Sequence, residues 1–252
     1  MKKFFILLGM LFCTQFAMPL FAGQNPLVIF DQGHGQRFTI EQKEGLHLSG
    51  LASLFSEGGF EVKSVKGQIT DEVLAGVHVL IISGAFSPFS PQEIDAISRF
   101  VEKGGNLSVM LHIPQTVAGL LGKFHVITSN YVLNEQENMI NSKPKDFYVK
   151  KLEVHPLTKG LKKFAVHGGW ALMNEGGSGK LIAQTSGKAW VDFDRDGKLS
   201  EGDVKQSFGV VIAGTFGKGK FVVFGDDAIF QNTFLQNENL TLGKNLVKWL
   251  YK

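Results

Sequence analysis

The segment from Asp192 to Asp203 carries the most specific chemical pattern in the sequence. It reads DFDRDGKLSEGD, and oxygen-bearing residues recur along it with the spacing of an EF-hand calcium loop. A hard cation needs several oxygen ligands at about 2.3–2.6 Å, and glycine at the sixth position permits the sharp turn that gathers them. The pattern therefore predicts a Ca2+ site whose ligands are Asp192, Asp194, Asp196, the backbone carbonyl of Lys198, Ser200 and Asp203.

The last position of this loop departs from the usual pattern. Asp203 stands where EF-hand loops have glutamate, and its shorter side chain favours weaker Ca2+ binding or acceptance of Mg2+. The flanking segments are typical of strands rather than helices, so the loop is expected to stand alone. The alternative is an acidic turn without an ion. We favour the ion site, because five crowded acidic side chains would otherwise repel one another.

Four further candidates for chemistry follow predicted strands. Asp31 and His34 come after the apolar run Leu27–Phe30, while His112 and Asp226 follow two other such runs. Ligands of an open parallel sheet bind beyond the carboxyl ends of the strands, so these side chains are expected to gather at one edge. Together they could act in general base catalysis or hold a second metal. The alternative, which we favour over catalysis, is that each side chain only stabilises its own turn or packs at the edge.

Five other residues are candidates for binding a ligand. Ser83 follows a predicted strand, but its surroundings lack the G-x-S-x-G sequence of a serine hydrolase. His167 and Trp170 flank two glycines, and an aromatic ring with a polar edge suits contact with a sugar or a protein partner. A core position would equally suit this tryptophan. The complete set is Gln36, Ser83, Asp227, His167 and Trp170.

The order of predicted elements determines where these residues would lie. Short apolar or alternating runs predict strands over residues 27–30, 60–65, 77–83 and 106–112. Helical spacing with capping residues predicts helices over residues 39–56, 69–75, 90–103 and 240–251. Because strands and helices alternate through the first 112 residues, the sequence predicts right-handed crossovers and a parallel sheet.

The pattern loosens after residue 112. The polar segment 123–146 predicts a lid-like excursion. Short strands follow, and the glycines around Lys218 predict a hairpin between the strands at 208–215 and 220–225. We therefore expect a β-rich C-terminal extension that carries the calcium-type loop.

Several segments, taken in order, resemble the glutamine-amidotransferase-like proteins that lack a glutaminase centre. This group includes the DUF4350 proteins, the trehalose-utilisation-like proteins, and the GIFT-like domain of gliding-motility and intraflagellar-transport subunits. The resemblance implies a flavodoxin-like, mostly parallel sheet with helices on both faces, and it implies little about activity. The matching segments are VIFDQGHG (28–35), LIIS (80–83), SPQE (90–93), FVEKGG (100–105), HPLTKGL (155–161), GKGKFVVFGD (217–226) and residues 239–250.

One catalytic feature of the wider group is missing. True amidotransferases of this fold carry a nucleophilic cysteine after the strand that corresponds to residues 106–112. Here that strand continues into Leu111-His112-Ile113-Pro114, and the single cysteine of the chain is Cys13. The sequence therefore argues against glutaminase chemistry that depends on a thiolate.

The pattern of residues at the N-terminus predicts an exported protein. A basic start, an apolar core over residues 4–12 and a small residue at Ala22 form the layout of a signal peptide, residues 1–22, which leaves residues 23–252 as a single α/β domain. Removal of the signal peptide leaves 24 basic and 23 acidic residues, a net charge of +1. This near-neutral charge gives no electrostatic reason to expect binding to nucleic acid. Because no later segment has the length of a membrane span, we expect a secreted or periplasmic protein.

Two hypotheses for function follow. The first is a non-catalytic binding or scaffold domain for an unknown protein or glycan ligand, with one calcium-stabilised loop. The alternative is a periplasmic hydrolase that acts on a glycan through Asp31, His34, His112 and Asp226. Geometry distinguishes them, because a hydrolase needs those side chains within a few ångströms of one another in an open cleft.

Overall fold

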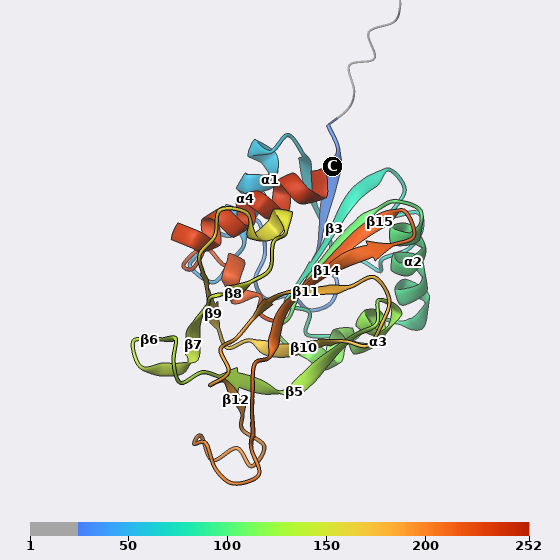
Figure 1. Cartoon of the computed structure of the whole chain (residues 1–252). Coiled ribbons are helices and arrows are strands. Elements are labelled where there is room, and N and C mark those ends of the chain that lie inside the picture. Colours follow the sequence, from blue (N-terminus) through green and yellow to red (C-terminus); the bar gives the residue numbers. More distant parts are fainter. Residues whose placement is uncertain (1–24, 252) are drawn as a thin grey trace, which may run out of the picture.

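The computed structural model describes residues 25–251, so the predicted signal peptide lies outside the described residues. Their fold is a mixed α/β structure in which helices cover both faces of one large sheet (Figure 1). The helices are α1 (Ser49–Glu57), α2 (Pro91–Glu102), α3 (Pro114–Lys123) and α4 (Asn237–Tyr251), with the short 3-10 turns η1 (Pro156–Thr158) and η2 (Ala228–Phe230). The strands are β1 (Leu27–Asp31), β2 (Glu61–Val65), β3 (Val77–Ser83), β4 (Asn106–Met110), β5 (Val126–Asn134), β6 (Met139–Ile140), β7 (Lys143–Val149), β8 (Lys151–Leu152), β9 (Phe164–His167), β10 (Trp170–Asn174), β11 (Lys180–Gln184), β12 (Trp190–Val191), β13 (Val204–Lys205), β14 (Gly209–Phe216) and β15 (Gly219–Phe224).

The amino-terminal half folds as a parallel sheet, as its alternating pattern predicts. Parallel pairing joins β2, β1, β3, β4 and β15 in that spatial order, which is the 2-1-3-4-5 order of flavodoxin-like sheets. Strands β1, β3 and β4 are buried over most of their length, because both faces of the sheet are covered. The carboxyl ends of β3, β4 and β15 therefore meet at one edge.

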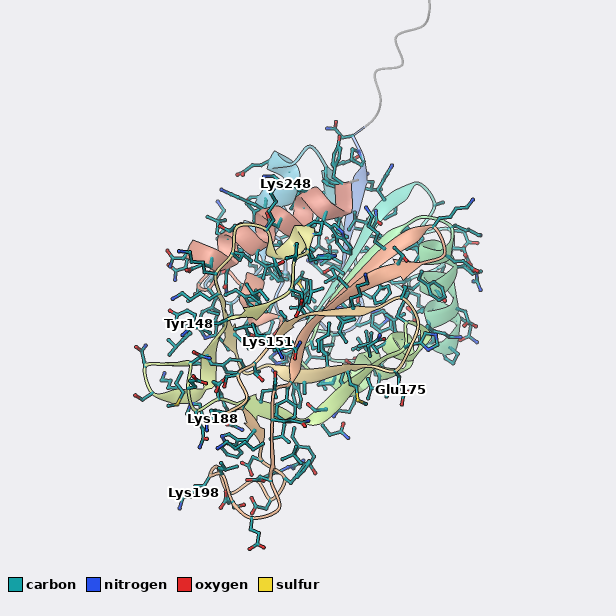
Figure 2. The ribbon with its side chains drawn as sticks, in the orientation of Figure 1. Tyr148, Lys151, Glu175, Lys188, Lys198 and Lys248 are labelled. Atoms are coloured by element: carbon teal, nitrogen blue, oxygen red, sulfur yellow. The ribbon has the colours of Figure 1, made fainter. Side chains whose placement is uncertain are left out.

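The remainder of the sheet is antiparallel. Strands β14 and β15 form a hairpin around Gly217, whose φ of +58° is a left-handed conformation that favours glycine. From β14 the sheet continues through β10, β5, β12 and β13, and each of these pairs is antiparallel. The expectation of a mostly parallel sheet is thus wrong for the sheet as a whole, because no α-helix lies between β5 and β14 to provide the crossovers that parallel pairing needs. Residues 192–203, which include Lys198, form a loop that projects beyond β12 (Figures 1 and 2).

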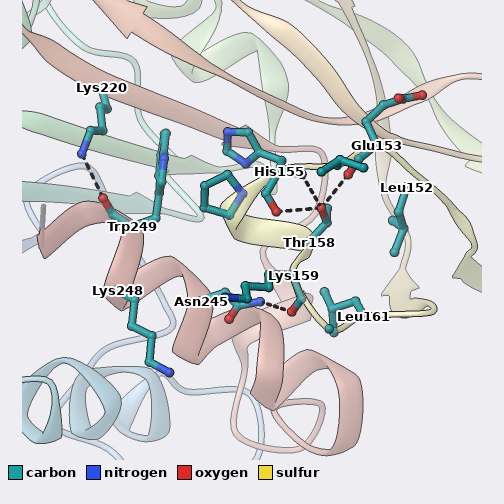
Figure 3. Close-up of a pocket in the computed structure, with 13 residues that line it drawn as sticks. Leu152, Glu153, His155, Thr158, Lys159, Leu161, Lys220, Asn245, Lys248 and Trp249 are labelled. Atoms are coloured by element: carbon teal, nitrogen blue, oxygen red, sulfur yellow. Dashed lines mark hydrogen bonds between the residues drawn. The ribbon is translucent and has the colours of Figure 1, made fainter.

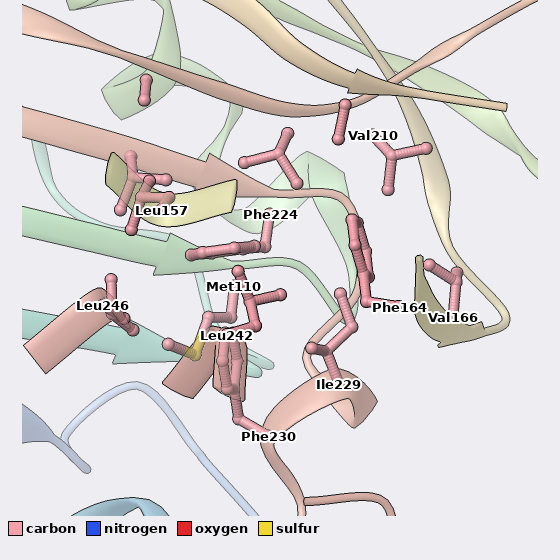
Figure 4. Packing of buried hydrophobic residues seen from close by; sticks show 14 of the residues in the cluster. Met110, Leu157, Phe164, Val166, Val210, Phe224, Ile229, Phe230, Leu242 and Leu246 are labelled. Carbon is pink, nitrogen blue, oxygen red and sulfur yellow. The ribbon is translucent and has the colours of Figure 1, made fainter. Parts of the chain in front are cut away.

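Two hydrophobic cores lie on the two faces of the sheet. Helices α1 and α4 pack over one core, and α2 and α3 pack over the other. Figure 4 shows part of the first core, where the rings of Phe224 and Phe230 meet edge to face at 4.9 Å near Leu242 of α4. Helix α2 begins with the predicted capping box between Ser90 and Glu93. Within residues 25–251, no helix combines the length and the apolar character needed to cross a membrane.

Two helices predicted from the sequence differ in the structure. Helix α1 begins at Ser49 rather than at Thr39, because the preceding residues form turns in which the Thr39 amide donates to the ring of His47. Residues 69–75 form turns and no helix. The Ile69 amide donates to the carboxylate of Glu93, so the start of this segment is held by α2.

The predicted lid-like excursion over residues 123–146 is also wrong. Strand β5 lies within it and pairs with both β10 and β12 in the large sheet. The next part forms β6 and β7, which make a small separate sheet with β9. These strands are polar because much of their surface is exposed, so the apolar periodicity that identifies a buried strand is weak here.

Candidate functional site

A cleft of about 520 Å³ opens at the carboxyl ends of β4 and β15. This is the edge at which open α/β sheets bind ligands. The cleft brings together five residues that the sequence analysis selected from three different segments, and the loop after β1 adds an apolar wall through Phe38. The five selected residues are His112, His167, Trp170, Asp226 and Asp227.

The central contact of the cleft is a histidine–carboxylate pair. His112 Nδ1 lies 3.2 Å from Oδ1 of Asp227, and 38% of the His112 side chain remains exposed. The hydrogen bond and the negative charge of Asp227 raise the pKa of His112 against the effect of burial. The rings of Phe38 and Phe86 lie 5.4 and 4.8 Å from the His112 ring, so the imidazole is held in place by its neighbours and open on one side.

Asp227 has a buried oxygen that no protein group satisfies. The residue is 2% exposed, and its Oδ2 has no hydrogen-bond partner among the described residues. Burial raises the pKa of Asp227, although the bond to His112 opposes this shift. A buried acceptor without a donor is costly, and this oxygen lies so close to Gly84 that a Cβ added there would come within 2.7 Å of it.

Asp226 lies beside Asp227 but is engaged differently. Its carboxylate accepts hydrogen bonds from the amides of His167, at 2.6 Å, and Ala228, at 2.9 Å. Burial, followed by the charge of Asp227, raises the pKa of Asp226 to about 8. Asp226 thus joins η2 to β9, and it contributes to the cleft as a wall rather than as an open acceptor.

His167 and Trp170 form the opposite side of the cleft. The ring of His167 stacks on Phe234 at 3.9 Å, and its Nδ1 lies 3.4 Å from Asp146. Burial lowers the pKa of His167 despite that carboxylate. The indole N–H of Trp170 donates to the backbone oxygen of His112 at 3.2 Å. The sequence leaves open whether Trp170 belongs to the core or to a pocket. In the structure its side chain holds the backbone of His112, whose imidazole lies at the centre of the cleft.

Asp31 and His34 lie in a separate cluster. Asp31 accepts from the amide of Gly33, the side chain of Gln36 and the ring of His34, whose Nδ1 lies 2.9 Å from Oδ2. The other ring nitrogen of His34 lies 3.1 Å from Glu93. Burial would lower the pKa of His34, but the bonds and charges of the two carboxylates outweigh it and raise the pKa. Asp31 and Asp226 therefore point into different hydrogen-bonded turns.

Some important residues carried no recognisable signal in the sequence. Glu93 was identified as a helix cap, but its contact with His34 joins residues 59 positions apart. Asp146 and Phe234 line the cleft from segments without a motif. Ser83 does not line it, and its buried Oγ has no partner among the described residues. Gln36 supports Asp31 instead of facing the cleft.

The predicted metal loop gathers three of its carboxylates. Oxygen atoms of Asp192, Asp194 and Asp196 all lie within 4.8 Å of one another. Asp192 also has a buried Oδ1 without a partner among the described residues. Ser200 Oγ donates to Asp194 at 3.1 Å. By contrast, both oxygens of Asp203 accept backbone N–H groups, from Phe193 and Ser200, so Asp203 closes the loop and lies outside the group of three.

Comparison with solved structures gives the class of the fold. The N-terminal domain of IFT52 is 18% identical, with 89% of this chain and 97% of that chain covered and a TM-score of 0.71. A ThuA-like protein from Parabacteroides merdae ATCC 43184 is 12% identical over 91% of each chain, with a TM-score of 0.56. A GMP synthase subunit from Thermoplasma acidophilum is 11% identical over 90% of this chain and 95% of that chain, with a TM-score of 0.54. At such identities the likeness shows the fold alone, which is amidotransferase-like.

A family model then places the chain more closely. The model described as domain of unknown function DUF4350 matches residues 48–247, so the chain belongs to the DUF4350 family. This confirms that part of the sequence resemblance. The search of curated proteins gave no match. The matched residues include the cleft residues His112, Asp226 and Asp227 but begin after Asp31 and His34.

Proposed function

We propose that the chain is an exported, non-catalytic binding domain that holds a hydroxyl-bearing ligand, such as a glycan, in the strand-end cleft. The observation that carries this proposal is the buried, unpartnered Oδ2 of Asp227 beside the half-open ring of His112. A carboxylate and an imidazole together offer an acceptor and a donor to a hydroxyl group. The cleft volume of about 520 Å³ suits a small ligand, since such pockets span about 300–1,000 Å³.

The geometry favours binding over glycan hydrolysis. A hydrolase working through the four sequence candidates would need all of them in the cleft, but Asp31 and His34 are engaged with Gln36 and Glu93 elsewhere. Asp226 is held by two backbone amides. The only cysteine is Cys13, in the predicted signal peptide, so the exported chain would have no thiolate nucleophile.

A titration followed by NMR tests the proposal. Maltose, cellobiose and N-acetylglucosamine would be added to the labelled protein, and at least one of them is expected to shift the ring resonances of His112 and the indole resonance of Trp170. Asp227→Asn should abolish these shifts. The matched control is Asp71→Asn, which removes a carboxylate that pairs with Arg99 on the surface and should leave the shifts intact.

Three results would count against the proposal. Shifts confined to residues outside the cleft, or the same response from both variants, would remove the cleft as the binding site. Release of new reducing ends during incubation would show hydrolysis and favour the alternative. Export has its own test: protein recovered from the periplasm of a bacterial host should have lost residues 1–22, as measured by mass spectrometry.

We also propose that the loop from Asp192 to Asp203 binds Ca2+. The support is the gathering of three carboxylates within 4.8 Å together with the unpartnered Oδ1 of Asp192. Mg2+ remains the alternative ion, because Asp203 is short and its oxygens accept two backbone amides, which limits its reach toward a cation. These features favour a weak site whose role is to stabilise the loop.

A further inference from the structure

A second cavity, of about 1,120 Å³, lies between α4 and the segment from Leu152 to Leu161 (Figure 3). We call it the α4 groove. It reaches Lys220 near the start of β15, whereas the strand-end cleft begins beyond the end of that strand. The groove is therefore distinct from the cleft, and a role for the groove is independent of the function proposed for the cleft.

The walls of the α4 groove are held by internal hydrogen bonds. The Asn245 side chain donates to the carbonyl oxygens of Leu157 and Lys159, both at 2.9 Å. Thr158 Oγ1 donates to the backbone oxygen of Glu153 at 2.6 Å. These bonds join η1 and the following turn to α4. The groove is consequently formed before any ligand arrives, and none of these contacts uses the charged end of a lysine.

Two lysines that line the α4 groove have no acidic partner among the described residues. Lys159 and Lys248 are exposed, and neither forms an ion pair within residues 25–251. Glu153 is the one acidic residue that lines the groove, and its carboxylate points away from both lysines in Figure 3. Residues 143–163 contain seven lysines and two acidic residues, so the positive charge extends beyond the groove itself.

Apolar and aromatic groups accompany the lysines. Val154 has a relative exposure of 105%, and Leu152 and Leu161 are only partly buried. Trp249 is flanked by the Lys220 amine, at 5.7 Å from its ring, and by the His155 ring at 5.4 Å. Since these neighbours flank the indole, the groove does not offer the open aromatic face on which a sugar would stack.

We propose that the α4 groove is a docking site for an acidic segment of a partner protein. The carboxylates of the segment would pair with Lys159 and Lys248, and its apolar side chains would contact Val154. Charge complementarity carries this assignment, because positive side chains with no internal partner favour an anionic occupant. The volume is larger than a single small anion requires, and the exposed valine favours a peptide, which supplies apolar side chains as well as charge.

A binding experiment with the full chain tests this docking site. The probe is a short fluorescein-labelled peptide of glutamate and leucine, and its counterpart carries glutamine in place of glutamate. The acidic peptide should shift the indole N–H resonance of Trp249 and bind at least about tenfold more tightly than the glutamine peptide. The double variant K159E/K248E should weaken binding by about tenfold or more and reduce its dependence on salt.

The matched control is the double variant K43E/K188E. Lys43 and Lys188 are exposed and form no ion pair within the described part of the chain, and Lys188 lies far from Lys248 in Figure 2. If the two double variants weaken peptide binding equally, the binding is non-specific electrostatic attraction and the proposal is wrong. Shifts of His112 in place of Trp249 would assign the peptide to the cleft instead.

A second copy of the chain is the competing occupant. The acidic loop around Asp194 and Asp196 would be the segment that enters the groove of a neighbour. In that case the protein would self-associate with rising concentration, and both K159E/K248E and D194N/D196N would abolish the association. Sedimentation velocity measures this directly, and such a result would replace the partner protein with a homo-oligomeric contact.

Discussion

The histidine–carboxylate clusters around His34 and His112 both lie near strand ends, and they differ in what they leave unpaired. After β1, both ring nitrogens of His34 face carboxylates, those of Asp31 and Glu93, at 2.9 and 3.1 Å. In the cleft, His112 has one carboxylate within hydrogen-bonding distance among residues 25–251, that of Asp227, whose second oxygen has no partner there. The same residue types thus build one closed cluster and one open cluster, and the open one leaves a carboxylate oxygen without a hydrogen-bond donor among the described residues.

The largest expected effect follows from breaking the closed cluster. Glu93→Ala should reduce the free energy of unfolding by about 3–5 kcal/mol, because it leaves a buried imidazolium with one carboxylate and removes the acceptor of the Ile69 and Ser90 amides. Urea denaturation measures the loss. Glu57→Ala, at an exposed helix end, is the control and should change stability by less than about 0.5 kcal/mol. A similar small effect for both variants would mean that the first cluster does not hold the fold.

Calcium binding is expected to have the next largest effect, and it tests a third group of acids, of which Asp194 and Asp196 are exposed. At a hundredfold excess over its dissociation constant, Ca2+ should stabilise the protein by about 2.7 kcal/mol. Chelation should therefore lower the melting temperature, and D192N/D196N should remove the response. Lys198→Ala is the matched control, because the predicted ligand at this position is a backbone carbonyl. An unchanged melting temperature on chelation and no heat of Ca2+ binding would contradict the metal site.

The closed cluster also predicts how stability depends on pH. The pKa of His34 is raised above 6.5 in the folded protein, so its contribution is complete below pH 6.5 and is lost as pH rises through the folded pKa. Asp226 acts in the same direction, because its pKa is raised from 3.8 to about 8 and burial of its ionised form is costly. His112 also has a raised pKa. Urea midpoints measured from pH 6.5 to about pH 9 should fall.

Variants separate these contributions. Asp227, whose pKa is also raised by burial, is a fourth group that acts in this direction. In the triple variant D226N/D227N/H112Q only His34 of these four groups still titrates, so the loss of stability that persists above pH 6.5 belongs to His34. If the urea midpoint of this variant does not change with pH, the carboxylates of Asp31 and Glu93 do not stabilise the charged form of His34. A profile identical to that of the wild type would show instead that the open cluster does not affect stability in this range.

The sequence predicted the parallel half of the fold well, because buried parallel strands are continuous apolar runs. The strand from Val77 to Ser83 and the capping box at Ser90 are examples, and both are present in the structure. Strand β5 was missed, since the polar run from Thr128 to Asn130 in its middle interrupts the apolar periodicity. Local patterns carry information about single elements, whereas the antiparallel half depends on pairing between strands that are far apart in the sequence, such as β5 with β10 and β10 with β14.

The candidate site was predictable only in part, and for a physical reason. A position after a buried strand indicates an edge, which is why His112 and Asp227 could be selected. It does not indicate whether a side chain is already satisfied. The partner of His34 is Glu93, on a helix 59 residues later, and the wall of the cleft includes Phe234 from near α4. Such contacts arise from tertiary packing, so a sequence pattern alone could not distinguish the closed cluster from the open one.

The smallest effect on stability is expected from Asp227→Asn, which tests the open cluster. The amide is easier to bury than a carboxylate, and this offsets the loss of the charge-assisted bond to His112, so the free energy of unfolding should change by less than about 1 kcal/mol. The pKa of His112 should nevertheless fall, because the Asp227 hydrogen bond is the main cause of its elevation. An NMR titration of the ring resonances measures this pKa directly.

His34 provides the internal reference for that titration. Its ring contacts Asp31 and Glu93 and not Asp227, so its pKa should stay the same in the variant while that of His112 decreases. Parallel decreases at both rings would mean that the substitution disturbs the whole strand edge. An unchanged His112 would mean that Asp227 is not its partner in solution, and the buried oxygen of Asp227 would then no longer identify a ligand position beside an imidazole. A decrease in the pKa of His112 alone is therefore the result that distinguishes the open cluster around His112 from the closed cluster around His34.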